Sequence, residues 1–315
     1  MRVYRWDLDK TYLETDFGSL RALVRSAVEP ASAKRAIPGA TALMQELAQD
    51  NPGWRPRIFI LSGSPTQMRK VLEEKLRIDG VRWDELILKD NLANLRKGRL
   101  RAVRGQFGYK LPALLSGRFG LGPLVHETLF GDDAEVDALV YSVYADAIAG
   151  RIAPVELSRI LAAAGAYPDH VVDALSALRR VEHADAVDRI FIRQDRGRAL
   201  DAFAALGPRV ILVRSWVEAA IVLAAAGELA PASLERVRAA TALSEGELVA
   251  RFRSVLERGH VEPEGATRAF AALAHHPAWV ACAELLRREA VTYRPPTAPV
   301  GLDWVELVRA FEGKR

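Results

Sequence analysis

Short apolar segments alternate with amphipathic segments along the first half of the chain. Four of the apolar runs are rich in β-branched and aromatic residues and end at polar or turn-forming residues, which predicts buried strands. These runs are Met1–Leu8, Arg57–Leu61, Glu85–Leu88 and Glu127–Phe130. Because the segments between them have helical periodicity, we expect an α/β fold: a Rossmann-like parallel sheet with helices on both faces.

The pattern changes after Gly150. Helical periodicity rich in Ala, Leu and Arg follows, and two strand-like runs, Ile190–Ile192 and Val210–Val213, interrupt it. We expect these runs to extend the same sheet. From Pro231 onward the pattern is helical only, with a turn at Gly246. The expected organisation is therefore a core over residues 1–150, an αβ extension packed on the core sheet over 151–230, and a mostly α-helical C-terminal region over 231–315.

Composition narrows the class of protein. The 315 residues include 44 Lys and Arg against 40 Asp and Glu, a net charge of +4, and half are hydrophobic, as in a folded globular protein. The single cysteine, Cys282, excludes an internal disulfide framework. No apolar run approaches the roughly 18–20 residues of a membrane span, and the charged N-terminus does not match a signal peptide. We expect a soluble, cytoplasmic protein whose small net charge does not indicate nucleic-acid binding.

Basic residues gather in one short stretch before Lys110. They are Arg96, Lys97, Arg99, Arg101 and Arg104. One interpretation is a solvated loop. The other is a basic rim that contacts an anionic substrate, because the stretch lies between a predicted strand end and Lys110.

Reactive side chains follow the first two predicted strands. Right-handed crossovers bring the carboxyl ends of parallel strands to one edge, where ligands of such folds bind. Asp7 and Asp9 follow the first strand, so one carboxylate can attack phosphorus while the other donates a proton to the leaving oxygen. Ser62 follows the second strand and can hold a phosphoryl oxygen, with Ser64 as a second candidate.

Two later segments complete the set. Lys110, expected to open a helix, is a point charge suited to a phosphate and a carboxylate together. Gly131-Asp132-Asp133, expected to begin a helix, and Asp137 supply the hard oxygen ligands that Mg²⁺ prefers. Each feature is common by itself. Their order along the chain indicates phosphoryl-transfer chemistry.

This ordered set resembles the haloacid dehalogenase (HAD) superfamily of phosphohydrolases over about residues 1–150, most specifically in Asp7-Leu8-Asp9-Lys10-Thr11-Tyr12. The resemblance implies a Mg²⁺-dependent phosphatase in which Asp7 is the nucleophile and forms an aspartyl-phosphate. Asp9 would be the general acid and then the general base, and Lys110 would stabilise the charge on Asp7 and the phosphate. The short spacing between the first two motifs leaves no room for a large cap domain.

The resemblance also assigns the binding groups. The substrate phosphate would be bound by Ser62, Gly63 and Thr11. The ligands of Mg²⁺ would be Asp7, Asp132 and the backbone carbonyl of Asp9. Asp133 and Asp137 would support the metal or Lys110.

Within the superfamily, three segments are similar to a phosphatidate-phosphatase-like branch that includes the actin-patch phosphatase catalytic domain and the lipins. These segments are Leu61–Pro65, Gln106–Lys110 and Gly131–Tyr141. The branch implies phosphatidate, or another small-molecule or bulky phosphate, as substrate and allows peripheral membrane contact. It usually carries an acid where this chain has Lys10. The physiological substrate and the oligomeric state stay open.

Other classes are consistent with the same motifs. A non-catalytic scaffold could keep the fold and use the helical C-terminal half for interaction. A phosphotransferase would pass the phosphoryl group to an acceptor other than water. Mg²⁺ binding at the strand edge distinguishes an active enzyme from a scaffold.

Overall fold

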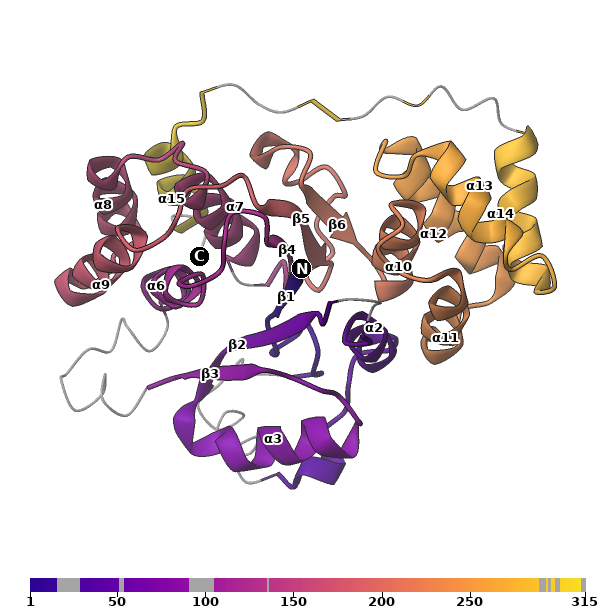
Figure 1. The fold of residues 1–315 in the computed structure, drawn as a ribbon, viewed down its shortest axis with the longest axis horizontal. Helices are drawn as coiled ribbons and strands as arrows, with labels where there is room; N and C mark the ends of the chain where they lie inside the picture. The colour runs from indigo at the N-terminus through magenta and orange to yellow at the C-terminus, as the bar shows by residue number, and fades with distance from the viewer. Residues whose placement is uncertain are drawn as a thin grey trace.

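Within the residues that the structure describes, six parallel strands form one sheet at the centre of this computed structural model (Figure 1). The structure describes residues 1–15, 29–50, 54–90, 105–134, 136–288, 293, 296–297 and 301–312. The strands are β1 (Arg2–Trp6), β2 (Arg57–Pro65), β3 (Glu85–Lys89), β4 (His126–Asp132), β5 (Val187–Arg193) and β6 (Val210–Val213). They confirm the predicted parallel sheet, with β5 and β6 extending it.

The strand order β3-β2-β1-β4-β5-β6 contains one reversal of direction. The chain first moves outward from β1 through β2 to β3, then returns to the other side of β1 and moves outward again through β4, β5 and β6. The reversal therefore lies between the neighbouring strands β1 and β4. In open α/β sheets, ligands bind outside the carboxyl ends of the strands at such a switch point.

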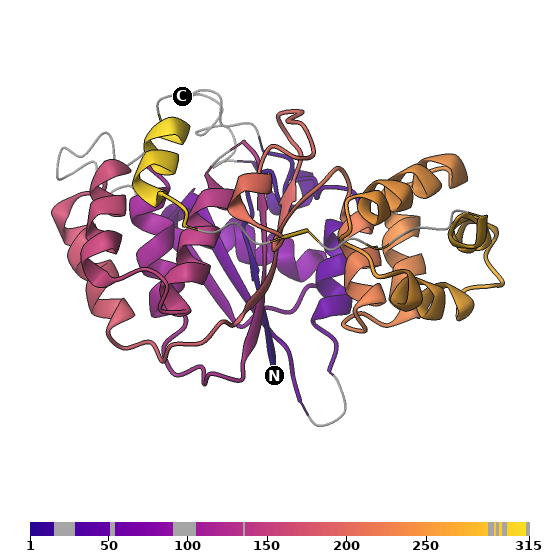
Figure 2. The same ribbon diagram turned by 90° about the horizontal axis from the view of Figure 1, so that it is seen from above.

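Helices on one face of the sheet form two layers (Figure 2). The inner helices are α2 (Ala40–Leu47), α3 (Arg69–Ile78) and α10 (Trp216–Ala225). The outer group begins with α11 (Pro231–Thr241), α12 (Glu245–Glu257) and α13 (Pro263–Ala271), which pack on α10. The last helix of the group, α14 (Pro277–Arg288), packs on α12 and α13. Because α10 is covered by the sheet on one side and these helices on the other, all ten of its residues are buried. Three 3₁₀ turns are also described, at Ala31–Ala33, Thr66–Met68 and Ala204–Leu206.

The opposite face carries a second group of helices (Figure 1). They are α6 (Phe107–Ser116), α7 (Asp137–Ile148), α8 (Pro154–Ala163), α9 (Pro168–Leu178) and α15 (Trp304–Glu312). α6 and α7 lie against the sheet, while α15 packs on α8. The predicted helical C-terminal region is thus divided between the two faces, with α11–α14 on one and α15 on the other.

An aromatic stack fills the core beneath the switch point. Trp6 on β1 and Phe130 on β4 stack with ring centroids 4.0 Å apart, and Trp216 of α10 packs at an angle against both. The three side chains are fully buried. The indole Nε1 of Trp216 donates a hydrogen bond to the carbonyl oxygen of Thr11 at 3.0 Å, which ties this core to the loop after β1.

Three sequence-based expectations about local structure are wrong. Lys110 lies inside α6 and does not open it, because its amide donates to the Gln106 carbonyl and the helix begins at Phe107. Gly131 and Asp132 end β4, since both pair with β5, so the helix begins only at Asp137. Gly246 lies inside α12, because the Ser244 side chain caps that helix two residues earlier.

No helix among the described residues has the length and apolar character that a membrane crossing requires.

The histidine after α12 makes the fold sensitive to acid. Burial, with a contribution from the nearby Arg258 charge, lowers the pKa of His260 to about 4. An unfolded chain binds this proton near pH 6.5. The contribution of neutral His260 to the stability of the fold is therefore present above about pH 6.5 and is lost as the pH falls toward 4.

We predict that His260→Gln loses less unfolding free energy between pH 7 and pH 4.5 than the wild type does, because glutamine cannot take up the proton. Urea denaturation at the two pH values measures this difference. The exposed His275→Gln is the control and should lose as much as the wild type. If all three proteins lost the same amount of unfolding free energy, His260 would not be the group that lowers stability in acid.

Candidate active site

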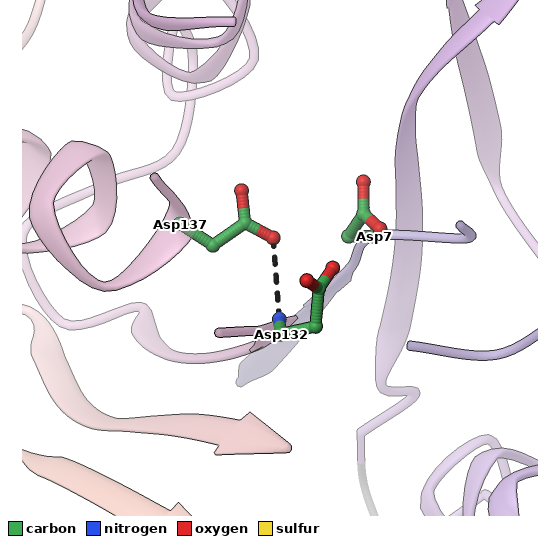
Figure 3. Close-up of side chains that lie close together, drawn as sticks. All are labelled: Asp7, Asp132 and Asp137. Carbon is green, nitrogen blue, oxygen red and sulfur yellow. Dashed lines mark hydrogen bonds between the residues drawn. The ribbon is translucent and has the colours of Figure 1, made fainter. Parts of the chain in front are cut away.

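Three aspartates from different segments meet at the switch point (Figure 3). Asp7 directly follows β1, Asp132 is the last residue of β4, and Asp137 is the first residue of α7. Each offers a carboxylate oxygen, and these three atoms all lie within 4.8 Å of one another. The backbone amide of Asp7 donates to the carbonyl of Phe130 at 2.9 Å, so pairing between β1 and β4 brings the first two carboxylates together.

Lys110 provides the positive charge within this cluster. Its Nζ lies 2.9 Å from Oδ1 of Asp7 and 2.5 Å from Oδ1 of Asp137, and all three side chains are fully buried. Removing such charges from water is costly, and close pairing offsets part of that cost. The lysine therefore fixes the positions of both carboxylates.

Gly131 allows Asp137 to come this close to the strand. A Cβ atom on Gly131 would lie 2.5 Å from Oδ2 of Asp137 and 2.9 Å from the ring of Tyr141. Burial, followed by the Asp137 charge, raises the pKa of Tyr141 well above its usual range. The Tyr141 phenol therefore stays neutral and adds no further negative charge to the cluster.

The Asp9 carboxylate faces the end of β2. Its Oδ2 accepts hydrogen bonds from the hydroxyls of Ser62 and Ser64, both at 2.9 Å. The Ser64 amide also donates to the Ser62 hydroxyl at 3.0 Å. Both serines therefore contact Asp9, whereas the sequence favoured Ser62 over Ser64 as the hydroxyl at this position. Because β2 continues to Pro65, both hydroxyls lie on the strand end and not in a following turn.

Gly63 and Thr11, the other predicted phosphate-binding residues, lie at the same edge. A Cβ atom on Gly63 would meet Nε2 of Gln106 at 2.6 Å, so the glycine leaves room for that side chain. The Thr11 hydroxyl donates to Oδ2 of Asp132 at 3.4 Å. Oδ1 of Asp132 accepts from the amide of Ala134 at 2.7 Å. Asp132 is therefore held from both sides.

Asp133 contacts a different segment of the chain from the three clustered aspartates. Its Oδ1 accepts from the amides of Asp195 and Arg196, at 2.6 and 2.8 Å, in the loop that follows β5. It is not part of the group whose oxygens lie within 4.8 Å of one another. Its buried carboxylate therefore holds a neighbouring loop.

The end of β5 and the loop after it supply contacts that local sequence patterns did not indicate. Nε of Arg193 donates to the carbonyl oxygen of Lys10 at 2.6 Å, and Nζ of Lys10 lies 3.3 Å from Oδ2 of Asp195. Burial acts to raise the pKa of Asp195, but the Lys10 and Arg193 charges lower it by more. The run Arg193-Gln194-Asp195-Arg196 directly follows a predicted strand, and that position was the signal available in the sequence.

The predicted basic rim falls on residues that the structure does not describe. Arg96, Lys97, Arg99, Arg101 and Arg104 all lie within residues 91–104.

The carboxylate cluster fits a divalent cation. Among the described residues, Asp7, Asp132 and Asp137 are buried together beside Lys110. Carboxylate oxygens are hard ligands of the kind that Mg²⁺ prefers. A bound Mg²⁺ would bring positive charge to the point where the three carboxylates meet.

No family model, curated protein or solved structure matches this chain. Function is therefore inferred from the chemistry of the site.

We predict that Lys110→Met lowers the free energy of unfolding by about 3–5 kcal/mol, because it leaves buried carboxylates without their cation. Urea denaturation in EDTA measures this loss without interference from a bound metal. The exposed Lys70→Met removes the same charge from α3 and should change stability little. If both variants were as stable as the wild type, Lys110 would not hold the cluster together.

Proposed function

We propose that this protein is a Mg²⁺-dependent phosphohydrolase that acts on phosphomonoesters through an aspartyl-phosphate intermediate. The supporting observation is that two carboxylates, two residues apart in the sequence, are held by different groups. Lys110 holds Asp7 through Oδ1, while Ser62 and Ser64 hold Asp9 through Oδ2. Covalent phosphoryl transfer needs one carboxylate as a nucleophile and another as an acid and base.

In the first step, a carboxylate oxygen of Asp7 attacks phosphorus in line with the ester bond. The bond between phosphorus and the leaving oxygen breaks, and Asp9 donates a proton to that oxygen. The product alcohol leaves and Asp7 carries the phosphoryl group. Lys110 stays beside the Asp7 carboxylate throughout and offsets negative charge there.

In the second step, Asp9 takes a proton from water, and the resulting hydroxide attacks phosphorus. The bond between phosphorus and Asp7 breaks, which releases inorganic phosphate and restores the carboxylate. The resemblance assigns the phosphoryl oxygens to groups at the end of β2, so the Ser62 hydroxyl would turn from Asp9 to the phosphate when substrate binds.

The metal would be held by Asp7, Asp132 and the carbonyl of Asp9, with Asp137 positioning Lys110. Bound Mg²⁺ supplies Lewis-acid neutralisation of the phosphate charge, so that two anions can approach each other. The resemblance to the phosphatidate-phosphatase-like branch makes phosphatidate the first natural substrate to test, followed by other small-molecule phosphates. Catalysis at a membrane surface would then require only peripheral contact.

We predict that Asp7→Asn lowers the rate of phosphate release by on the order of 10⁴-fold or more, because the amide is a poor nucleophile. The assay is inorganic phosphate release from p-nitrophenyl phosphate with Mg²⁺ and with EDTA. The melting temperature and circular dichroism should show that the variant keeps its fold. Substantial residual turnover would contradict the nucleophile assignment, and absence of both turnover and Mg²⁺ binding in the wild type would favour a scaffold.

We predict that Asp9→Asn separates the two steps. Nitrophenolate leaves without a proton, so the first step should continue, while water attack loses its base and slows by about 10²–10⁴-fold. Rapid mixing with p-nitrophenyl phosphate should therefore give a burst of nitrophenolate equal to the enzyme concentration, followed by slow turnover. Asp7→Asn is the matched control and should give no burst. A single slow phase in Asp9→Asn would show that Asp9 does not act mainly on the second step.

A further inference from the structure

The residue after Asp9 has an unusual backbone conformation. Lys10 has a φ of 62°, in the left-handed region that residues other than glycine rarely adopt. The peptide that joins Asp9 to Lys10 carries the Asp9 carbonyl oxygen, so the φ of Lys10, together with the ψ of Asp9, sets the direction in which this oxygen points. Whatever holds Lys10 in place therefore orients a proposed ligand of the metal.

Both polar atoms of the Lys10 backbone are held. Its amide donates to the carbonyl of Leu13 at 2.9 Å and to the hydroxyl of Thr15 at 3.1 Å. Its carbonyl accepts from Nε of Arg193 at 2.6 Å. The first two contacts are local, whereas the third comes from the end of β5, two strands away in the sheet.

The loop that follows β5 holds the segment that carries Asp132. The amides of Asp195 and Arg196 donate to Oδ1 of Asp133, and Nε of Arg198 donates to the Asp133 carbonyl at 3.2 Å. In return, the Asp133 amide donates to the carbonyl of Arg193 at 3.1 Å. Asp133 is fully buried, and its chain neighbour is the metal-cluster residue Asp132.

An ion network joins the two sets of contacts. Nη2 of Arg193 lies 2.7 Å from Oδ1 of Asp195, and Oδ2 of that carboxylate lies 3.3 Å from Nζ of Lys10. Residues 193–196 thus contact the loop after β1 and the end of β4 at once. We call these four residues the β5 clamp.

We infer that the β5 clamp positions the metal ligands, with Arg193 and Asp133 as positioning residues. Arg193 acts on the Asp9 carbonyl through Lys10, and Asp133 acts on the Asp132 carboxylate through the chain. This inference rests on the proposed metal-dependent function and adds to it. Ser62 and Ser64 lie on β2, outside the clamp, so the clamp governs metal affinity and not the hydrogen bonds that hold Asp9.

The first test is the affinity for Mg²⁺, measured by calorimetry on the full chain without substrate. Arg193→Gln should raise the dissociation constant about 10–100-fold, as loss of an outer partner of a metal ligand commonly does. Arg189 lies on β5, as Arg193 does, and forms an ion pair with Glu228. Arg189→Gln removes that ion pair and should leave the dissociation constant for Mg²⁺ unchanged.

A second pair of variants tests Asp133. Asp133→Asn keeps the oxygen that accepts from both loop amides and should bind Mg²⁺ within a few-fold of the wild type. Asp133→Ala removes that acceptor and should weaken binding about tenfold or more. Equal weakening by both variants would overturn the positioning role and indicate that the Asp133 charge acts on the metal directly.

The outcomes separate the clamp from the proposed function. If Arg193→Gln and Asp133→Ala leave Mg²⁺ binding unchanged and the protein still releases phosphate, the positioning role of the β5 clamp is overturned. The proposed function would then stand. Absence of Mg²⁺ binding in the wild type would overturn both. If Arg193→Gln does not fold, the Asp133 pair decides the question.

Discussion

Close pairing of one buried lysine with two buried aspartates is the interaction on which the candidate site depends. Lys110 brings Asp7 and Asp137 within hydrogen-bond distance of one nitrogen, and Asp132 lies beside them. Like charges this close would repel strongly in a region without water. The position of the carboxylates therefore depends on the lysine, and their close approach is the basis for the proposed Mg²⁺ site.

A second buried ionic cluster lies on the side of the sheet that carries α6 and α7 and surrounds one carboxylate. There Glu127 of β4 is contacted by Arg5, Arg118 and the hydroxyl of Tyr144. Burial lowers the pKa of Arg5, but Glu127 raises it by more, so the guanidinium stays charged. This cluster holds a single carboxylate between two guanidinium groups, whereas three carboxylates gather near Lys110 at the switch point. The contrast supports a structural role for one and a chemical role for the other.

Much of the fold and several of the site residues could be predicted from local patterns. Apolar runs such as Val210–Val213 predicted strands because burial on both faces requires continuous hydrophobicity, and that strand has the predicted bounds. Asp7, Ser62 and Asp132 were identifiable because they stand at strand ends, and the parallel order brings all strand ends to one edge. Helix starts were less predictable: pairing of β4 with β5 keeps Gly131 and Asp132 extended, a contact that no local pattern records.

By itself, then, the sequence determined the alternation of strands and helices, the parallel sheet and the carboxylates at its edge, since each follows from periodicity or from position after a strand. Only the tertiary structure decided how these groups are held. The contact of Arg193 with Lys10 joins residues 183 positions apart, and Ser64 shares Asp9 with Ser62 across 55 positions. The return of α15 to the opposite face is of the same kind. Such contacts form only when segments distant in the sequence pack together, so the pattern of residues within one segment does not predict them.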